Sequence, residues 1–192
     1  MPDGSKRKDA EKLFLSVFPE DEEQVYSDSD LYDVQVRDLI NNYIANTRSS
    51  DGTFNLLAYG DTIGEVESRG NPLAHQVGGG PGRGKYQFEP DGAATASRRL
   101  KALSTALGFK NPDWNREDSV RDATKLTEAQ QDILFLADKL QARDINLKDL
   151  ADGNISGEDF WIQHHWKGDA ADEPARRLHY RNTVDWMNRD EE

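Results

Sequence analysis

The chain has 192 residues, of which 35% are hydrophobic and 31% charged, a composition typical of one globular domain with or without an appendage. Its formal net charge of −12 would repel the phosphates of DNA and RNA, so nucleic acid is not an expected partner. The lack of cysteine excludes disulfides, thiolate metal sites and a cysteine nucleophile. No apolar run approaches the roughly 20 residues that span a bilayer, so membrane insertion is not expected.

Residues 1–50 are predicted to form an N-terminal helical and acidic extension. "DAEKLFLSVF" favours a short helix, "PEDEEQVYSDSD" favours a solvated linker, and the next segment favours a helix capped by Ser29 or Asp30. The basic start is followed only by the apolar run "LFLSVF", which is shorter than the roughly 7–15 apolar residues of a secretory signal. The sequence therefore predicts no signal peptide.

Residues 51–192 are predicted to form a second, mostly α-helical domain. Apolar residues recur at helical spacing in 54–68, and Arg69, Gly70 and Pro72 are typical of the end of that helix. The other predicted helices are 91–107, 126–143 with Thr127 as its cap, a helix within 156–168, and 173–190. The aromatic segment 83–89 is extended in character and predicts at most a small β element.

The stretch "GGGPGRGKYQF" at residues 78–88 has the spacing of a phosphate-binding loop but not its context. Gly79, Gly84 and Lys85 satisfy G-x-x-x-x-G-K, but Tyr86 stands where Ser or Thr would hold magnesium. The preceding segment is predicted to be a helix, whereas a phosphate loop follows a strand. We therefore interpret the stretch as a surface loop whose glycines permit unusual backbone angles, and we expect no cofactor.

Two further patterns have partial metal-site character. Asp152, Asn154 and Ser156 match the first half of a calcium loop, but Gln163 replaces its bidentate glutamate, so a helix-initiating turn is predicted instead. Adjacent histidines at 164–165 point about 100° apart on a helix and do not grip one metal together. No metal site is predicted.

Two carboxylates near the end of the first predicted helix differ in their surroundings. Glu65 and Glu67 lie about 200° apart around the helix. Glu67 follows Ile63 by four residues and is next to Val66, so it lies on the apolar face, whereas Glu65 lies on the solvated side. Burial raises the pKa of a carboxyl group, which suits a proton donor near neutral pH.

The alternative for Glu67 is a structural ion pair. A charged group on an apolar face costs free energy unless it is paired or protonated. Arg69, Arg83 and Arg98 are the candidate partners. Spacing alone does not decide between this role and catalysis.

The order of motifs in residues 60–96 resembles the soluble lytic transglycosylase family, a branch of the lysozyme-like superfamily, and its phage-encoded members above all. The matching motifs are Glu67-Ser68, then "NPLA" at 71–74, then "GKYQFEP" at 84–90. The departures are Lys85-Tyr86 in place of Leu-Met and a loop richer in glycine. "HHWKG" at 164–168 is a loose counterpart of the family's Ala-Tyr-Asn-Ala-Gly motif, with Trp166 near the tyrosine position.

This resemblance implies a lysozyme-like domain at 51–192 with a substrate cleft, and cleavage of the β-1,4 bond between N-acetylmuramic acid and N-acetylglucosamine in peptidoglycan. Glu67 would act as the acid and then as the base, giving a 1,6-anhydro end. Substrate contacts are expected from six residues: Ser68 and Gln87 by hydrogen bonds, Tyr86, Phe88 and Trp166 through ring faces unless they are core, and His165 through its loose motif.

Two alternatives stay open. A hydrolytic lysozyme needs a second carboxylate, for which Glu89 and Asp91 are the candidates. A catalytically weak module of a virion or envelope assembly would instead use residues 1–50 to dock on virion or lysis-system partners. Without a signal peptide, the enzyme is expected in the host cytoplasm until a pore releases it to the periplasm, or in a virion.

Overall fold

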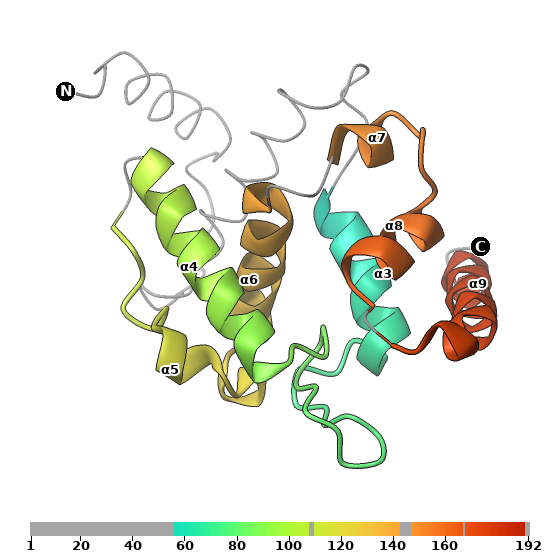
Figure 1. The fold of residues 1–192 in the computed structure, drawn as a ribbon, viewed down its shortest axis with the longest axis horizontal. Coiled ribbons are helices and arrows are strands. Elements are labelled where there is room, and N and C mark those ends of the chain that lie inside the picture. Colours follow the sequence, from blue (N-terminus) through green and yellow to red (C-terminus); the bar gives the residue numbers. More distant parts are fainter. Residues whose placement is uncertain (1–55, 108–109, 143–146, 167, 191–192) are drawn as a thin grey trace.

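The computed structural model describes residues 56–107, 110–142, 147–166 and 168–190 (Figure 1). Within these ranges the chain forms seven α-helices and two short 3-10 helices. The α-helices are α3 (Leu56–Ser68), α4 (Pro90–Leu107), α5 (Glu117–Val120), α6 (Glu128–Gln141), α7 (Leu147–Ala151), α8 (Gly157–His164) and α9 (Glu173–Asp190). The predicted extension at residues 1–50 lies outside the described residues.

Helix α6 is the centre of this arrangement. It packs along α4 on one side and against α3 on the other (Figure 1). Helix α3 in turn contacts α9, and α9 contacts α8. Five consecutive α6 residues from Ile133 to Ala137 are buried, as expected of a helix surrounded by others. No helix in the described ranges is long and apolar enough to cross a membrane.

The predicted end of the first helix is confirmed. Helix α3 stops at Ser68, and both Arg69 and Gly70 adopt left-handed backbone conformations, with φ of 57° and 67°. The Gly70 N–H then donates to the Gly64 carbonyl at 3.1 Å, which satisfies one of the carbonyls left open at a helix end. The chain leaves α3 sharply and enters the loop that joins it to α4.

The small β element predicted near residues 83–89 is not a strand. Arg83 makes single antiparallel bridges to His75 and Phe88, and no strand forms in the described part of the chain. Gly84 and Gln87 have φ of 76° and 49°, which lie in the left-handed region and interrupt extended backbone. The segment is therefore a compact loop.

Helix α6 begins with the predicted threonine cap, and its loss gives a test of the fold. The Thr127 hydroxyl accepts from the Gln130 N–H, while the Gln130 side chain accepts from the Thr127 N–H. Thr127→Ala is expected to destabilise the protein by about 1 kcal/mol, lowering the melting temperature by about 2–4 °C. Thr105→Ala, on the exposed face of α4, is the control and should leave the melting temperature unchanged or raise it slightly. Equal effects in a thermal melt would contradict the capping role.

Candidate active site

Glu67 lies at the penultimate position of α3 with its side chain mostly withdrawn from water. The side chain is 14% exposed, and its neighbours Ile63 and Val66 are buried in the core. Glu65 is half-buried and lies on another side of the helix. The apolar face of α3 therefore carries one carboxyl group into the interior at the point where the helix ends.

The carboxyl group of Glu67 is held by an indole. Trp161 of α8 donates from Nε1 to Glu67 Oε1 at 2.7 Å. His165, which follows α8, places Nε2 3.7 Å from the same oxygen. Helix α8 is fixed against α3 by a second bond, in which the Tyr59 hydroxyl donates to the Gly157 carbonyl at 3.0 Å. Both contacts cross from α3 to the region of α8.

The structural ion pair considered for Glu67 does not form with any of the three candidate arginines in the described residues. Arg98 pairs with Glu117 at 2.6 Å on the surface. Arg83 donates to the backbone carbonyls of Gly80 and Gly82 within its own loop. Within the part of the chain that the structure describes, Glu67 is thus held by a neutral donor and has no guanidinium partner.

Burial is the largest influence on the pKa of Glu67, and it raises that pKa. The hydrogen bond from Trp161 acts in the opposite direction, as do the positive charges of Arg176, His179 and Lys139. The net effect is still a raised pKa. The position of Glu67 at the C-terminal end of α3 adds to this, because the negative end of the helix dipole disfavours a carboxylate there.

Two histidines contact backbone carbonyls near the site, one at the end of α3 and one in the loop before α4. His179 of α9 lies with Nε2 2.8 Å from the Val66 carbonyl, and His165 lies with Nε2 3.0 Å from the Tyr86 carbonyl. A carbonyl can only accept, so Nε2 carries the hydrogen in both rings. His164 points elsewhere, with its ring against Phe160 at 4.7 Å. No group of metal-binding side chains is found in the described ranges.

Ser68 joins the end of α3 to the loop before α4. Its hydroxyl lies 2.8 Å from the Lys85 carbonyl and 3.2 Å from the Gly64 carbonyl. Since one hydroxyl hydrogen serves these two acceptors, a glycan contact through Ser68 would have to use its oxygen lone pairs. Gln87 turns back onto its own loop, where Nε2 donates to the Gly84 carbonyl at 2.9 Å.

The aromatic residues considered for sugar contacts lie mainly in the core. Tyr86 and Phe88 are buried, and the Tyr86 ring stacks on Phe135 with centroids 4.4 Å apart. Neither ring therefore offers an exposed face to a sugar, which corrects that expectation in favour of its core alternative. Trp166 is partly buried against the same core.

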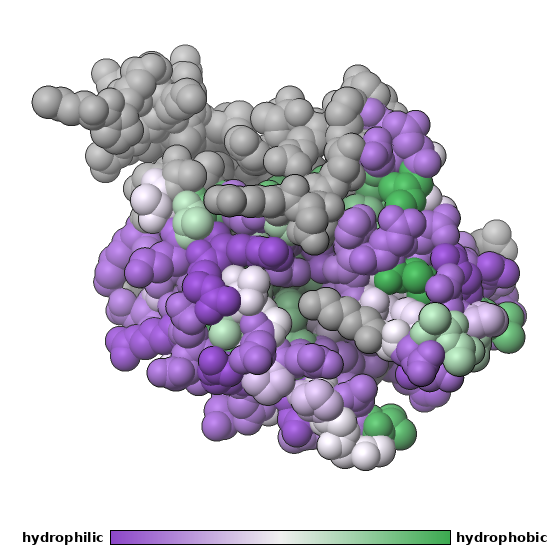
Figure 2. Space-filling model, viewed as in Figure 1, coloured by the Kyte–Doolittle hydropathy of each residue, from purple (hydrophilic) through white to green (hydrophobic). Residues whose placement is uncertain are grey.

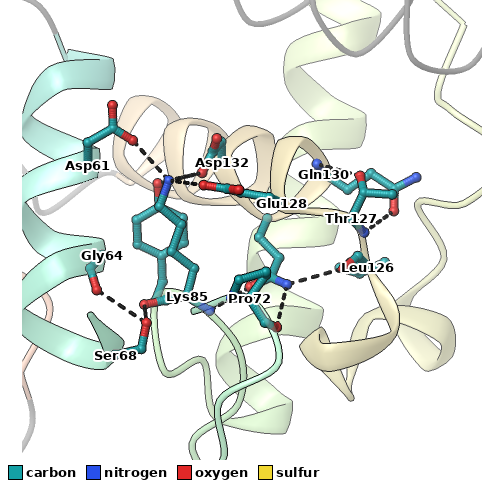
Figure 3. A network of polar contacts seen from close by, with 12 residues as sticks. Asp61, Gly64, Ser68, Pro72, Lys85, Leu126, Thr127, Glu128, Gln130 and Asp132 are labelled. Carbon is teal, nitrogen blue, oxygen red and sulfur yellow. Dashed lines mark hydrogen bonds and ion pairs between the residues drawn. The ribbon is translucent and has the colours of Figure 1, made fainter. Parts of the chain in front are cut away.

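Lys85 is the centre of a polar network that ties the loop to α3 and α6 (Figure 3). Its ammonium group lies 2.9 Å from Asp61 and 3.0 Å from both Glu128 and Asp132. Burial would lower the pKa of Lys85, but these carboxylates more than offset it and raise the pKa instead. Because Lys85 is committed to them, it is not placed to bind a phosphate. The Tyr86 hydroxyl also donates to Asp132, at 2.8 Å.

The surface has recesses beside the helices that surround the site. Figure 2 shows a largely hydrophilic face that is hollowed between the side of α4 and α6 and the side of α8 and α9. A cavity of about 540 Å³ is lined by Leu57, Asp61, Lys85, Thr127, Glu128, Ala129 and Asp132. The residues that line this cavity do not include Glu67, Trp161 or His165.

Known proteins give no direct guide to this site. Comparison of the chain with protein-family models, with curated proteins and with solved structures finds no match. The resemblance noted above therefore rests on short motifs and their order in residues 60–96. The chemistry has to be argued from the site itself.

Sequence reasoning missed two residues of the site, Trp161 and His179. Trp161 lies four residues before His165, so both fall on one side of α8 and its continuation, which is a signal that the sequence contains. His179 lies more than one hundred residues from the carbonyl it binds, and nothing in the local pattern of α9 indicates that contact. Trp161 could have been found; His179 could not.

Replacing Lys85 by the family's leucine tests the loop network. Lys85→Leu leaves Asp132 buried without its cation, which is expected to cost about 3–5 kcal/mol of unfolding free energy at neutral pH. Burial already raises the pKa of Asp132 in the folded protein, so the folded state gains stability as pH falls through that pKa. The loss should therefore shrink between pH 7.5 and pH 5 in denaturant unfolding.

Two variants serve as controls for that measurement. Asp132→Asn combined with Lys85→Leu removes the unpaired charge and should recover part of the stability. Lys125→Leu replaces an exposed lysine and should change the unfolding free energy by about 0.5 kcal/mol or less. A loss that is equal at both pH values and that Asp132→Asn does not relieve would contradict the role given to Lys85.

Proposed function

We propose that this protein cleaves the β-1,4 bond between N-acetylmuramic acid and N-acetylglucosamine in peptidoglycan by lytic transglycosylation, with Glu67 as the single catalytic residue. On this proposal residues 51–192 form a lysozyme-like domain that acts in phage lysis or entry. The motif order of residues 60–96 supports the family, and the surroundings of Glu67 support the chemistry. No cofactor takes part.

One observation carries the proposal: Glu67 is a mostly buried carboxyl group held by the neutral indole of Trp161. A structural glutamate in this position would be expected to pair with an arginine or lysine. A carboxyl group with a raised pKa can instead hold a proton near neutral pH and release it to a substrate. Perturbed groups of this kind concentrate at functional sites.

The reaction needs one group that gives a proton and then takes one. Protonated Glu67 would donate its proton to the glycosidic oxygen while the bond from that oxygen to the muramoyl C1 breaks. The resulting carboxylate would accept the proton of the muramoyl C6 hydroxyl as that oxygen bonds to C1. The products are a free hydroxyl on the leaving sugar and a 1,6-anhydro ring, and Glu67 ends protonated. Because the nucleophile belongs to the substrate, positioning contributes heavily to the rate.

Substrate binding would depend on polar and backbone groups around the helix end. The chain's net charge of −12 gives no attraction to an anionic wall. Ser68, Gln87, His165 and Trp166 stay as the proposed contacts, since each is at least partly accessible. Tyr86 and Phe88 contribute by packing the loop.

Hydrolysis would need a second carboxylate near the sugar. Glu89 and Asp91 are both exposed, and Asp91 pairs with Arg121 at 2.7 Å. No hydrogen bond or ion pair joins either of them to Glu67 or Trp161 among the described residues. The order of the motifs in residues 60–96 is what favours the non-hydrolytic reaction.

Digestion of purified peptidoglycan tests the proposal. The parent protein is expected to release muropeptides with 1,6-anhydro ends, read by mass spectrometry. Glu67→Gln should reduce the rate by at least about 10³-fold, because it removes both proton transfers, each worth about 10²–10⁴-fold. Reducing ends would mean a hydrolase, and no release would mean a binding module.

The matched control is Glu65→Gln, which makes the same chemical change two residues away. This variant should keep most of the activity and the same products. Both variants should unfold close to the parent temperature, since the amide oxygen in Glu67→Gln can still accept from Trp161. Release of anhydro products by Glu67→Gln at the parent rate would show that another group is the acid.

A further inference from the structure

We propose that the indole N–H of Trp161 positions Glu67 so that Oε1 is a permanent hydrogen-bond acceptor and Oε2 is the oxygen that carries, donates and retakes the proton. Trp161 is then a positioning residue that acts through Glu67. This inference rests on the proposed function for its catalytic consequence. The pairing itself can be tested without any activity.

The two oxygens of Glu67 differ in their partners. Oε1 accepts from the N–H of Trp161 at 2.7 Å, and His165 Nε2, whose hydrogen is directed at the Tyr86 carbonyl, lies 3.7 Å away. An indole nitrogen can only donate, so a proton on Oε1 would point at another hydrogen. Oε2 makes no hydrogen bond to any described residue, and the side chain is 14% exposed to solvent. The transferable proton therefore belongs on Oε2.

The indole has little freedom to leave this position. Trp161 is 1% exposed, and its ring stacks on Tyr180 of α9 with centroids 5.5 Å apart. The bond from Tyr59 to the Gly157 carbonyl fixes the start of α8 as well. A donor held in place costs no reorganisation when charge develops on its acceptor.

The bond becomes stronger when Glu67 gives up its proton. While Glu67 is protonated, Trp161 donates to a neutral carbonyl oxygen, and after the transfer it donates to a carboxylate. Hydrogen bonds to charged groups are shorter and stronger than neutral ones. Trp161 therefore favours proton release from a group that burial would otherwise hold protonated.

Other charged groups also face Glu67 and have to be kept constant in a test. Arg176 and His179 lie on α9 and Lys139 lies on α6, and all three act on Glu67 electrostatically. His165 follows α8 at 3.7 Å. The readout must therefore separate the effect of these groups on the indole from that of Glu67.

The experiment follows the four tryptophan indole N–H resonances of the full chain by ¹⁵N NMR across pH. Trp161→Phe assigns the Trp161 resonance by its disappearance. In the parent this resonance should shift with a midpoint above 4.5, the ordinary value for a glutamate. In Glu67→Gln that transition should vanish, while a shift of any other origin should persist.

The second readout is the pH profile of peptidoglycan cleavage. Without the indole donor the pKa of Glu67 should rise further, so the alkaline fall of kcat/KM should move upward by about one pH unit in Trp161→Phe. The rate constant kcat should fall about 10-fold while KM changes little. Trp186→Phe, an exposed tryptophan of α9, is the matched control and should leave the profile unchanged.

The two readouts separate the two proposals. A Trp161 resonance that does not follow Glu67 overturns the positioning role, whatever the activity. If Trp161→Phe is active and the alkaline fall of its kcat/KM stays at the parent pH, the positioning role is overturned as well. A resonance that follows Glu67 in a protein that cleaves nothing supports the pairing and overturns the proposed function.

Discussion

Withdrawing a carboxyl group from water is costly in free energy, and most of the properties proposed for this protein depend on how the structure deals with that cost at Glu67. The end of α3 brings the group inward, and a neutral indole donor replaces the water it loses. Arg176, His179 and Lys139 act on it electrostatically and offset part of the penalty. The outcome is a raised pKa together with a supported carboxylate, so both protonation states are accessible.

The loop before α4 solves the same problem in the opposite way. Lys85 lies among Asp61, Glu128 and Asp132, and these ion pairs fix its charge. That network gives rigidity, since it joins α3, the loop and α6. Ser68, next to Glu67, bonds to the backbone of Lys85. The carboxyl group proposed to exchange a proton is therefore tied to a neighbouring network of fixed charges.

The extent to which the sequence predicted this structure follows from how local each signal is. The cap at Thr127 and the helix end at Ser68 were predicted correctly because both arise from residues within one turn. The small β element allowed near 83–89 amounts to isolated bridges of Arg83, because left-handed Gly84 and Gln87 interrupt an otherwise extended pattern. Burial of Tyr86 and Phe88 depends on α6, far along the chain. Local spacing therefore did not decide whether these rings lie in the core or contact a sugar.

The same distinction holds for the site. Glu67 was predicted to lie on the apolar face from the positions of Ile63 and Val66, and it is mostly buried. Its partner Trp161 is 94 residues away; the spacing of Trp161 from His165 is a signal in the sequence, but the pairing of the indole with Glu67 is set by the fold. The identity of that partner is what separates a proton donor from a structural ion pair.

The most direct test of this account is the pKa of Glu67 itself, measured by ¹³C NMR of glutamate side-chain carboxyl carbons in the parent and in Glu67→Gln. The account predicts one resonance that titrates above the ordinary value of 4.5 and that disappears in the variant. If the resonance lost in Glu67→Gln titrates together with those of the exposed glutamates, Glu67 is an ordinary carboxylate and the central claim is wrong.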